Sequence, residues 1–89
     1  MRPYKSIGGL LAADILCATE EDSYLLLNAK QRDALCRLAT SFYGDALTYT
    51  RIVLVKTPVD NDQSVLCRCI YPHGGEIYIG IEEDGYTHS

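Results

Sequence analysis

A length of 89 residues and a hydrophobic fraction of 47% indicate a single folded domain over residues 1–89 and exclude a disordered chain. No apolar run approaches the roughly 18 residues that a membrane-spanning helix needs, so we expect no membrane partner. The net charge of −4 is concentrated in residues 57–89, where Arg68 is the only basic residue beside six acidic ones. Because a nucleic-acid backbone is bound by clustered Lys and Arg, we expect no nucleic-acid partner.

The first predicted element is a helix over about residues 8–18. The apolar residues that recur at helical spacing are Ile7, Leu10, Leu11, Ile15 and Ala18. Ser6 suits the N-cap position, and a strand over part of this run is the alternative. A weak signal peptide is a competing interpretation, because Arg2 and Lys5 precede the apolar stretch. Two glycines and an aspartate interrupt that stretch, so we expect a folded helix and a cytoplasmic protein.

A second helix is predicted over residues 28–43. Asn28 followed by Gln31 forms a capping-box pattern, and Gly44 suits the C′ position after the last turn. The apolar stripe between them consists of Leu35, Leu38, Ala39 and Phe42. We expect this stripe to cover a sheet. The preceding residues 24–27 are either a short buried strand or the approach to this helix.

The last half of the chain predicts an antiparallel meander over residues 47–86. Its three strands are 47–56, 64–71 and 76–84, each rich in β-branched or aromatic residues, with turns at 57–63 and 72–75. Helical elements that precede strands are typical of an α+β domain. We therefore predict two helices packed on a three- to four-stranded antiparallel β-meander, with a helical half (1–46) and a β-meander half (47–86).

A four-residue turn at 72–75 would pair Tyr71 with Glu76 and Cys69 with Tyr78. Because side chains alternate along a strand, this register sorts the second hairpin into two faces. The predicted core face carries Leu66, Ile70, Ile77, Ile79 and Ile81, with Arg68 among them. The other face carries Val65, Cys67, Cys69, Tyr71, Glu76, Tyr78, Gly80 and Glu82. Cover by the N-terminal helix and an intermolecular interface are both open for this second face.

The expected binding surface combines tyrosines, which are enriched at protein interfaces, with carboxylates, which steer association with a basic partner. Its residues are Tyr71, Tyr78, Glu76, Glu82, Glu83, Asp84, Asp60 and Asp62. We expect a protein partner with a basic surface. Asp60 and Asp62 begin like a calcium loop, but the glycine and glutamate that such a loop needs are missing, so this segment predicts a turn.

No arrangement of residues supports catalysis, and we expect neither enzyme activity nor a cofactor or metal. Cys67, Cys69 and His73 resemble half of a zinc site, but the spacing of the two cysteines is one residue and a second ligand pair is missing. We expect reduced thiols that pack in the core.

A small acidic protein without chemistry of its own is typical of inhibitors that occupy the basic surface of a larger nucleic-acid-binding machine. Phage-encoded antagonists of defence complexes, anti-CRISPR proteins among them, belong to this class. The sequence thus favours a protein-binding module that acts as an inhibitor. Two alternatives stay open: a structural or regulatory homodimer that uses a Tyr71/Tyr78 sheet face, and a small metal- or ligand-binding protein that uses Cys67, Cys69 and His73.

Overall fold

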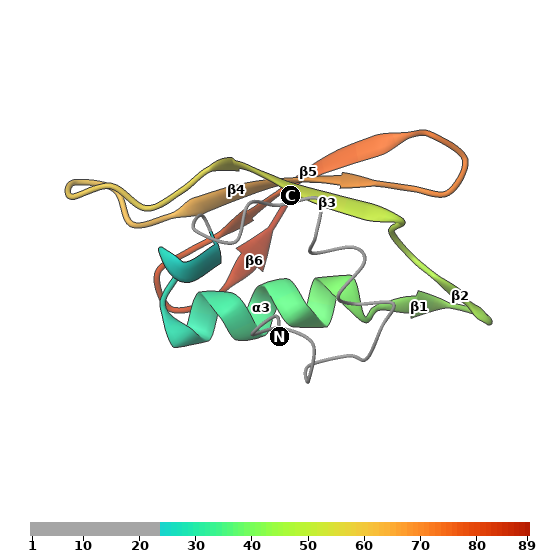
Figure 1. Cartoon of the computed structure of the whole chain (residues 1–89), viewed down its shortest axis with the longest axis horizontal. Coiled ribbons are helices and arrows are strands. Elements are labelled where there is room, and N and C mark those ends of the chain that lie inside the picture. Colours follow the sequence, from blue (N-terminus) through green and yellow to red (C-terminus); the bar gives the residue numbers. More distant parts are fainter. Residues whose placement is uncertain (1–23) are drawn as a thin grey trace.

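A computed structural model describes residues 24–89, and these residues form an α-helix and two antiparallel sheets (Figure 1). The helix is α3 (Ala29–Ala39), and the small sheet pairs β1 (Phe42–Tyr43) with β2 (Ala46–Leu47). The large sheet has the order β3 (Arg51–Lys56), β4 (Val65–Ile70), β5 (Glu76–Ile81) and β6 (Thr87–His88). The prediction of two helices packed on one meander is therefore wrong: these residues form an α+β fold dominated by its sheets. The helix predicted over 8–18 lies outside the described residues.

Helix α3 begins where the sequence predicts, at a capping box. The Asn28 side chain accepts a hydrogen bond from the Gln31 amide at 2.8 Å, and the Gln31 side chain accepts one from the Asn28 amide at 3.2 Å. These two bonds satisfy amides that the first helical turn cannot pair internally. Tyr24 and Leu25, just before it, are helical and not a strand.

The helix ends earlier than predicted, at Ala39 with Thr40 as its C-cap. Gly44 does not follow the helix as a C′ residue. It occupies the two-residue turn between β1 and β2, where its φ of +66° is a conformation that glycine adopts without strain. Phe42, which the helical stripe placed in the core, therefore lies in β1 and is 58% exposed. The first predicted strand, 47–56, is divided accordingly between β2 and β3.

The core lies between α3 and one face of the large sheet (Figure 1). Burial alternates strictly along β4, where Val65, Cys67 and Cys69 are buried and the residues between them are half-buried. Opposite them, Leu35 and Ala39 of α3 are fully buried. The other fully enclosed apolar side chains include Leu27, Ile52 and Ile81. Each such aliphatic side chain contributes roughly 1.5–3 kcal/mol when it leaves water.

The register of the β4–β5 hairpin differs from the predicted one by one residue. Its loop has three residues, because the Gly74 amide donates to the Tyr71 carbonyl at 3.0 Å and the Tyr71 amide donates to the Gly75 carbonyl at 2.8 Å. Gly74 has a φ of +97°, and Gly75 closes the loop as the residue opposite Tyr71. Cys69 consequently pairs with Ile77, and Arg68 with Tyr78. The predicted pairs of Tyr71 with Glu76 and of Cys69 with Tyr78 are wrong.

Candidate functional site

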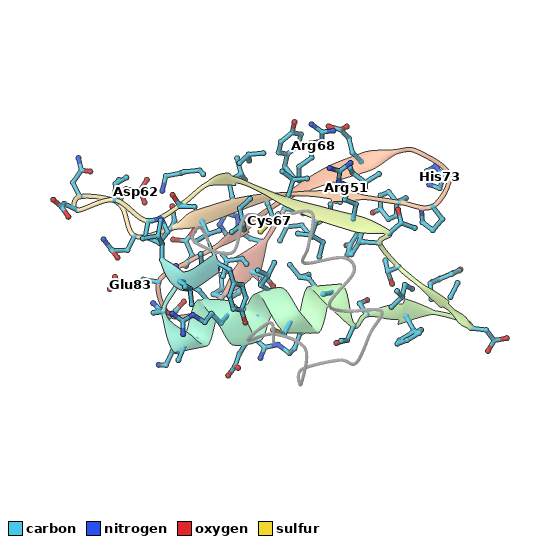
Figure 2. The ribbon with its side chains drawn as sticks, in the orientation of Figure 1. Arg51, Asp62, Cys67, Arg68, His73 and Glu83 are labelled. Atoms are coloured by element: carbon cyan, nitrogen blue, oxygen red, sulfur yellow. The ribbon has the colours of Figure 1, made fainter. Side chains whose placement is uncertain are left out.

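The two faces of the large sheet have a different composition from the predicted ones. The isoleucines of β5 face the core as expected, but they share that face with Val65, Cys67 and Cys69 of β4. The other side, which we call the outer face, consists of Arg51, Val53, Leu66, Arg68, Ile70, Glu76 and Tyr78. Figure 2 shows Arg51 and Arg68 on the side of the sheet away from α3, with Cys67 on the side toward it.

Tyr71 and Tyr78 lie on opposite sides of the sheet, so the predicted Tyr71/Tyr78 face does not exist. Tyr78 is 48% exposed on the outer face, directly across from Arg68. Tyr71 packs against the edge of the core, with its ring 5.3 Å from that of Tyr49 and stacked on His73 at 5.3 Å. Glu76 lies on the outer face beside Tyr78, and its Oε1 is 3.4 Å from Arg68 Nε.

The remaining five predicted site residues lie in two loops at one end of the molecule. Asp60 and Asp62 belong to the β3–β4 loop, which is a turn closed by a bridge between Val59 and Asp62, as the sequence predicts. Glu82, Glu83 and Asp84 belong to the β5–β6 loop. Figure 2 shows Asp62 and Glu83 at the same end of the structure. Carboxylates from segments about twenty residues apart in the chain are thus brought together.

A single buried side chain connects these two loops. Gln31, 1% exposed, donates from Nε2 to the Gln63 carbonyl at 2.6 Å and to the Glu82 carbonyl at 3.4 Å. Asn28 Nδ2 also donates to the Glu83 carbonyl at 2.9 Å. Both donors belong to the start of α3, so the positive end of the helix dipole lies beside the carboxylates and offsets part of their mutual repulsion.

Each of the two loops also exposes one apolar side chain. Val59, 50% exposed, accompanies Asp60 and Asp62, and Tyr86, 65% exposed, follows the acidic run of the β5–β6 loop. We call this surface the acidic end. Its members are Val59, Asp60, Asp62, Glu82, Glu83, Asp84 and Tyr86.

The carboxylates of the acidic end differ in their hydrogen bonds and ion pairs to the rest of the described chain. Asp62 accepts hydrogen bonds from the Ser64 hydroxyl and amide, which lower the pKa of its carboxyl group, and it lies 3.4 Å from Lys56 Nζ. Glu82 Oε2 lies 2.6 Å from His88 Nε2 in β6. The carboxylates of Asp60 and Glu83 take no part in the ion pairs of the described residues. Both side chains are exposed.

A cleft of about 590 Å³ lies between the β1–β2 hairpin and the β4–β5 loop. Its walls are mostly rings and apolar side chains: Tyr43, Ala46, Leu47, Thr48, Tyr71, Pro72 and His73. Among the described residues that line it there is no carboxylate, lysine or arginine. Tyr71, expected at an interface, therefore belongs to this cleft rather than to either charged surface.

Cys67, Cys69 and His73 do not converge. Both thiols are buried in the core, whereas His73 lies at the tip of the β4–β5 hairpin, as Figure 2 shows. Burial raises the pKa of Cys67 to about 12 and that of Cys69 to about 11, so both thiols are protonated at neutral pH. Within residues 24–89 no three His, Cys, Asp or Glu side chains are placed to hold a metal ion.

The sequence interpretation missed three residues that shape the acidic end. Val59 lies in the predicted turn at 57–63 and Tyr86 at the end of the predicted meander, and neither was given a role, although apolar residues beside carboxylates were a visible signal. Gln31 was recognised as a capping residue, but its contacts with two distant loops carry no local sequence signal.

No protein-family model, curated protein or solved structure matches this chain. The functional argument therefore depends on the surfaces described above. Among residues 24–89, none of the helices has the length and apolar character to span a lipid bilayer.

Proposed function

We propose that this protein is a protein-binding module whose acidic end contacts a basic surface of its partner. The observation that carries the proposal is the pair of hydrogen bonds from Gln31, because they hold two acidic loops as one surface. Because these loops are already held in place in the free protein, they lose little conformational entropy on binding, and this favours affinity. The exposed side chains of Val59 and Tyr86 provide apolar contact area beside the carboxylates, and the carboxylates steer association with a basic partner.

The test compares two variants that each lose two negative charges. Asp60→Asn/Glu83→Gln removes two of the five carboxylates of the acidic end, and Asp33→Asn/Asp45→Asn removes one carboxylate from α3 and one from the β1–β2 turn. The tagged proteins are used to capture partners from host lysate, and the retained protein is purified and titrated by calorimetry. We expect a partner whose bound surface is basic, with affinity lowered roughly tenfold by the first variant and unchanged by the second.

Ionic strength provides the second measurement. Attraction between exposed charges weakens as salt rises, so the wild-type affinity should fall with added salt and the Asp60→Asn/Glu83→Gln variant should show a shallower dependence. Equal affinity and equal salt dependence for all three proteins would place the binding surface elsewhere.

The finer part of the proposal is inhibition. A partner that uses its basic surface to bind DNA or RNA would lose that activity when the acidic end covers the surface, as phage-encoded antagonists of defence complexes such as anti-CRISPR proteins do. The measurement is competition: fluorescence anisotropy of labelled nucleic acid on the purified partner, with this protein added. Release of the nucleic acid by the wild type, but not by Asp60→Asn/Glu83→Gln, supports inhibition. Simultaneous binding refutes it.

A cytoplasmic location belongs to the same proposal. Cys36, Cys67 and Cys69 are free thiols in the folded protein, and free thiols persist in reducing compartments. Cell fractionation of the native host tests the location, and recovery outside the cytoplasmic fraction would contradict it.

A further inference from the structure

The outer face has the composition of an interface, and none of the elements in residues 24–89 covers it (Figure 1). Residues that are paired across the three adjacent strands form rows on this face. The central row consists of Val53 on β3, Arg68 on β4 and Tyr78 on β5. Tyrosine and arginine are among the residues enriched at energetic centres of protein interfaces. The acidic end lies outside the outer face, so the partner proposed for the acidic end would not cover the outer face. A different partner, or a second copy of this chain, would be needed to cover it.

The charges of the outer face are arranged so that it complements itself. One row contains Arg51 on β3, Ile70 on β4 and Glu76 on β5. A two-fold axis parallel to β4 exchanges the positions of β3 and β5 and keeps each row at its own level. Arg51 of one copy would then face Glu76 of the second copy, and the reciprocal pair would form on the other side of the axis.

The apolar residues follow the same symmetry. Ile70 and Leu66 both lie on β4, so each would meet its own counterpart across the axis. Val53 would face Tyr78 of the second copy, because β3 and β5 exchange places. Two sheets that pack face to face cross at about 30°, and the long side chains of Arg51 and Glu76 can span the offset that this angle introduces.

One contact on the axis is unfavourable in isolation. The Arg68 side chains of the two copies would lie close together, but each already has Glu76 of its own chain at 3.4 Å. Alternating arginines and glutamates would therefore form a network across the axis. We propose that the outer face is the interface of a homodimer, related by a two-fold axis parallel to β4.

The interface covers only three strands, so we expect a weak dimer whose population depends on concentration. Sedimentation equilibrium should show the mass rise from the monomer value of 9.9 kDa toward twice that value as concentration increases. Arg51→Glu and Glu76→Arg each place like charges opposite one another, and we expect each to weaken dimerisation by roughly tenfold or more.

Mixing the two single variants separates this proposal from a folding defect. An Arg51→Glu chain presents two glutamates and a Glu76→Arg chain presents two arginines, so the mixture should form a heterodimer although each variant alone is monomeric. Glu83→Arg, a reversal at the acidic end, should leave the wild-type association unchanged. A wild-type mass that stays at the monomer value, reversals that leave the dimer intact, or a mixture that stays monomeric would each overturn the proposal.

Discussion

Gln31 shows how one polar side chain can organise a surface that it does not itself expose. Its Oε1 accepts from the Asn28 amide, and its Nε2 donates to carbonyls of two loops far away in the chain. Buried carbonyls that lose a donor cost free energy, because water cannot replace the bond. The capping role is local and could be predicted from the spacing of Asn28 and Gln31. The contacts with the loops depend on tertiary packing and could not.

Replacing Gln31 with methionine keeps most of the side-chain volume and removes all of its hydrogen bonds. We expect Gln31→Met to lower the free energy of unfolding by about 2 kcal/mol, because the Gln63 and Glu82 carbonyls lose their donor. Lys30→Met is the matched control: Lys30 is exposed on the same helix, and its effect should stay within about 0.5 kcal/mol. Urea denaturation measures both. Similar stabilities for the two variants would show that the Gln31 hydrogen bonds contribute nothing net.

We expect the buried thiols of β4 to make the free energy of unfolding fall as the pH rises above about 9. Burial raises the pKa of Cys67 from 9.0 to about 12 and that of Cys69 from 9.0 to about 11. Above pH 9 the unfolded chain releases these protons while the folded protein keeps them, so the unfolded state binds fewer protons and stability falls as pH rises. The contribution is fully present below pH 9 and is lost progressively up to pH 11 to 12.

We expect each thiol to lower the free energy of unfolding by about 1 kcal/mol at pH 10 relative to pH 8. Urea denaturation at a series of pH values measures this slope. Cys67→Ala/Cys69→Ala should be less stable at neutral pH, because it leaves a cavity, but its stability should decline less steeply above pH 9. A slope that is identical in this variant would assign the alkaline loss to other groups.

At the scale of elements, the sequence predicts which segments are strands better than it predicts how they pair. Composition and alternation identify β4 and β5, but their register depends on whether Gly74 or Gly75 ends the loop. Gly74 adopts a positive φ, which shortens the loop to three residues and shifts the pairing by one. Because side chains alternate, that single residue moves β4 from one face to the other and separates Tyr71 from Tyr78.

Gly44 offers a direct test of how a turn glycine determines an element boundary. Its φ is +66° and an added Cβ would meet no atom of residues 24–89 within 4 Å, so a substitution there acts through the backbone preference. We expect Gly44→Ala to cost about 1 kcal/mol of stability, because a side chain disfavours a positive φ. Urea denaturation of the variant and the wild type measures the loss. Equal stabilities would indicate that the β1–β2 turn relaxes to another conformation.

At the scale of the whole molecule, the predicted binding site is divided among three places. The acidic loops could be recognised from their composition, but their position side by side results from the Gln31 contacts. Glu76 and Tyr78 lie on the outer face, and Tyr71 lines the cleft near His73. A sequence specifies charge along the chain, whereas a surface requires the register and the loop contacts that only the folded structure provides.

The two proposed interfaces should act independently. The row of Arg51, Ile70 and Glu76 is next to the β4–β5 loop, whereas the acidic loops follow the other ends of the six-residue strands, roughly 20 Å away. That separation exceeds the screening length of about 8 Å at physiological salt, so charges at one surface have little effect at the other. We expect Asp60→Asn/Glu83→Gln to dimerise like the wild type and Arg51→Glu to bind the partner with unchanged affinity per chain. Sedimentation equilibrium and calorimetry of both variants measure this, and loss of partner binding in Arg51→Glu would show that the partner recognises the dimer rather than a single acidic end.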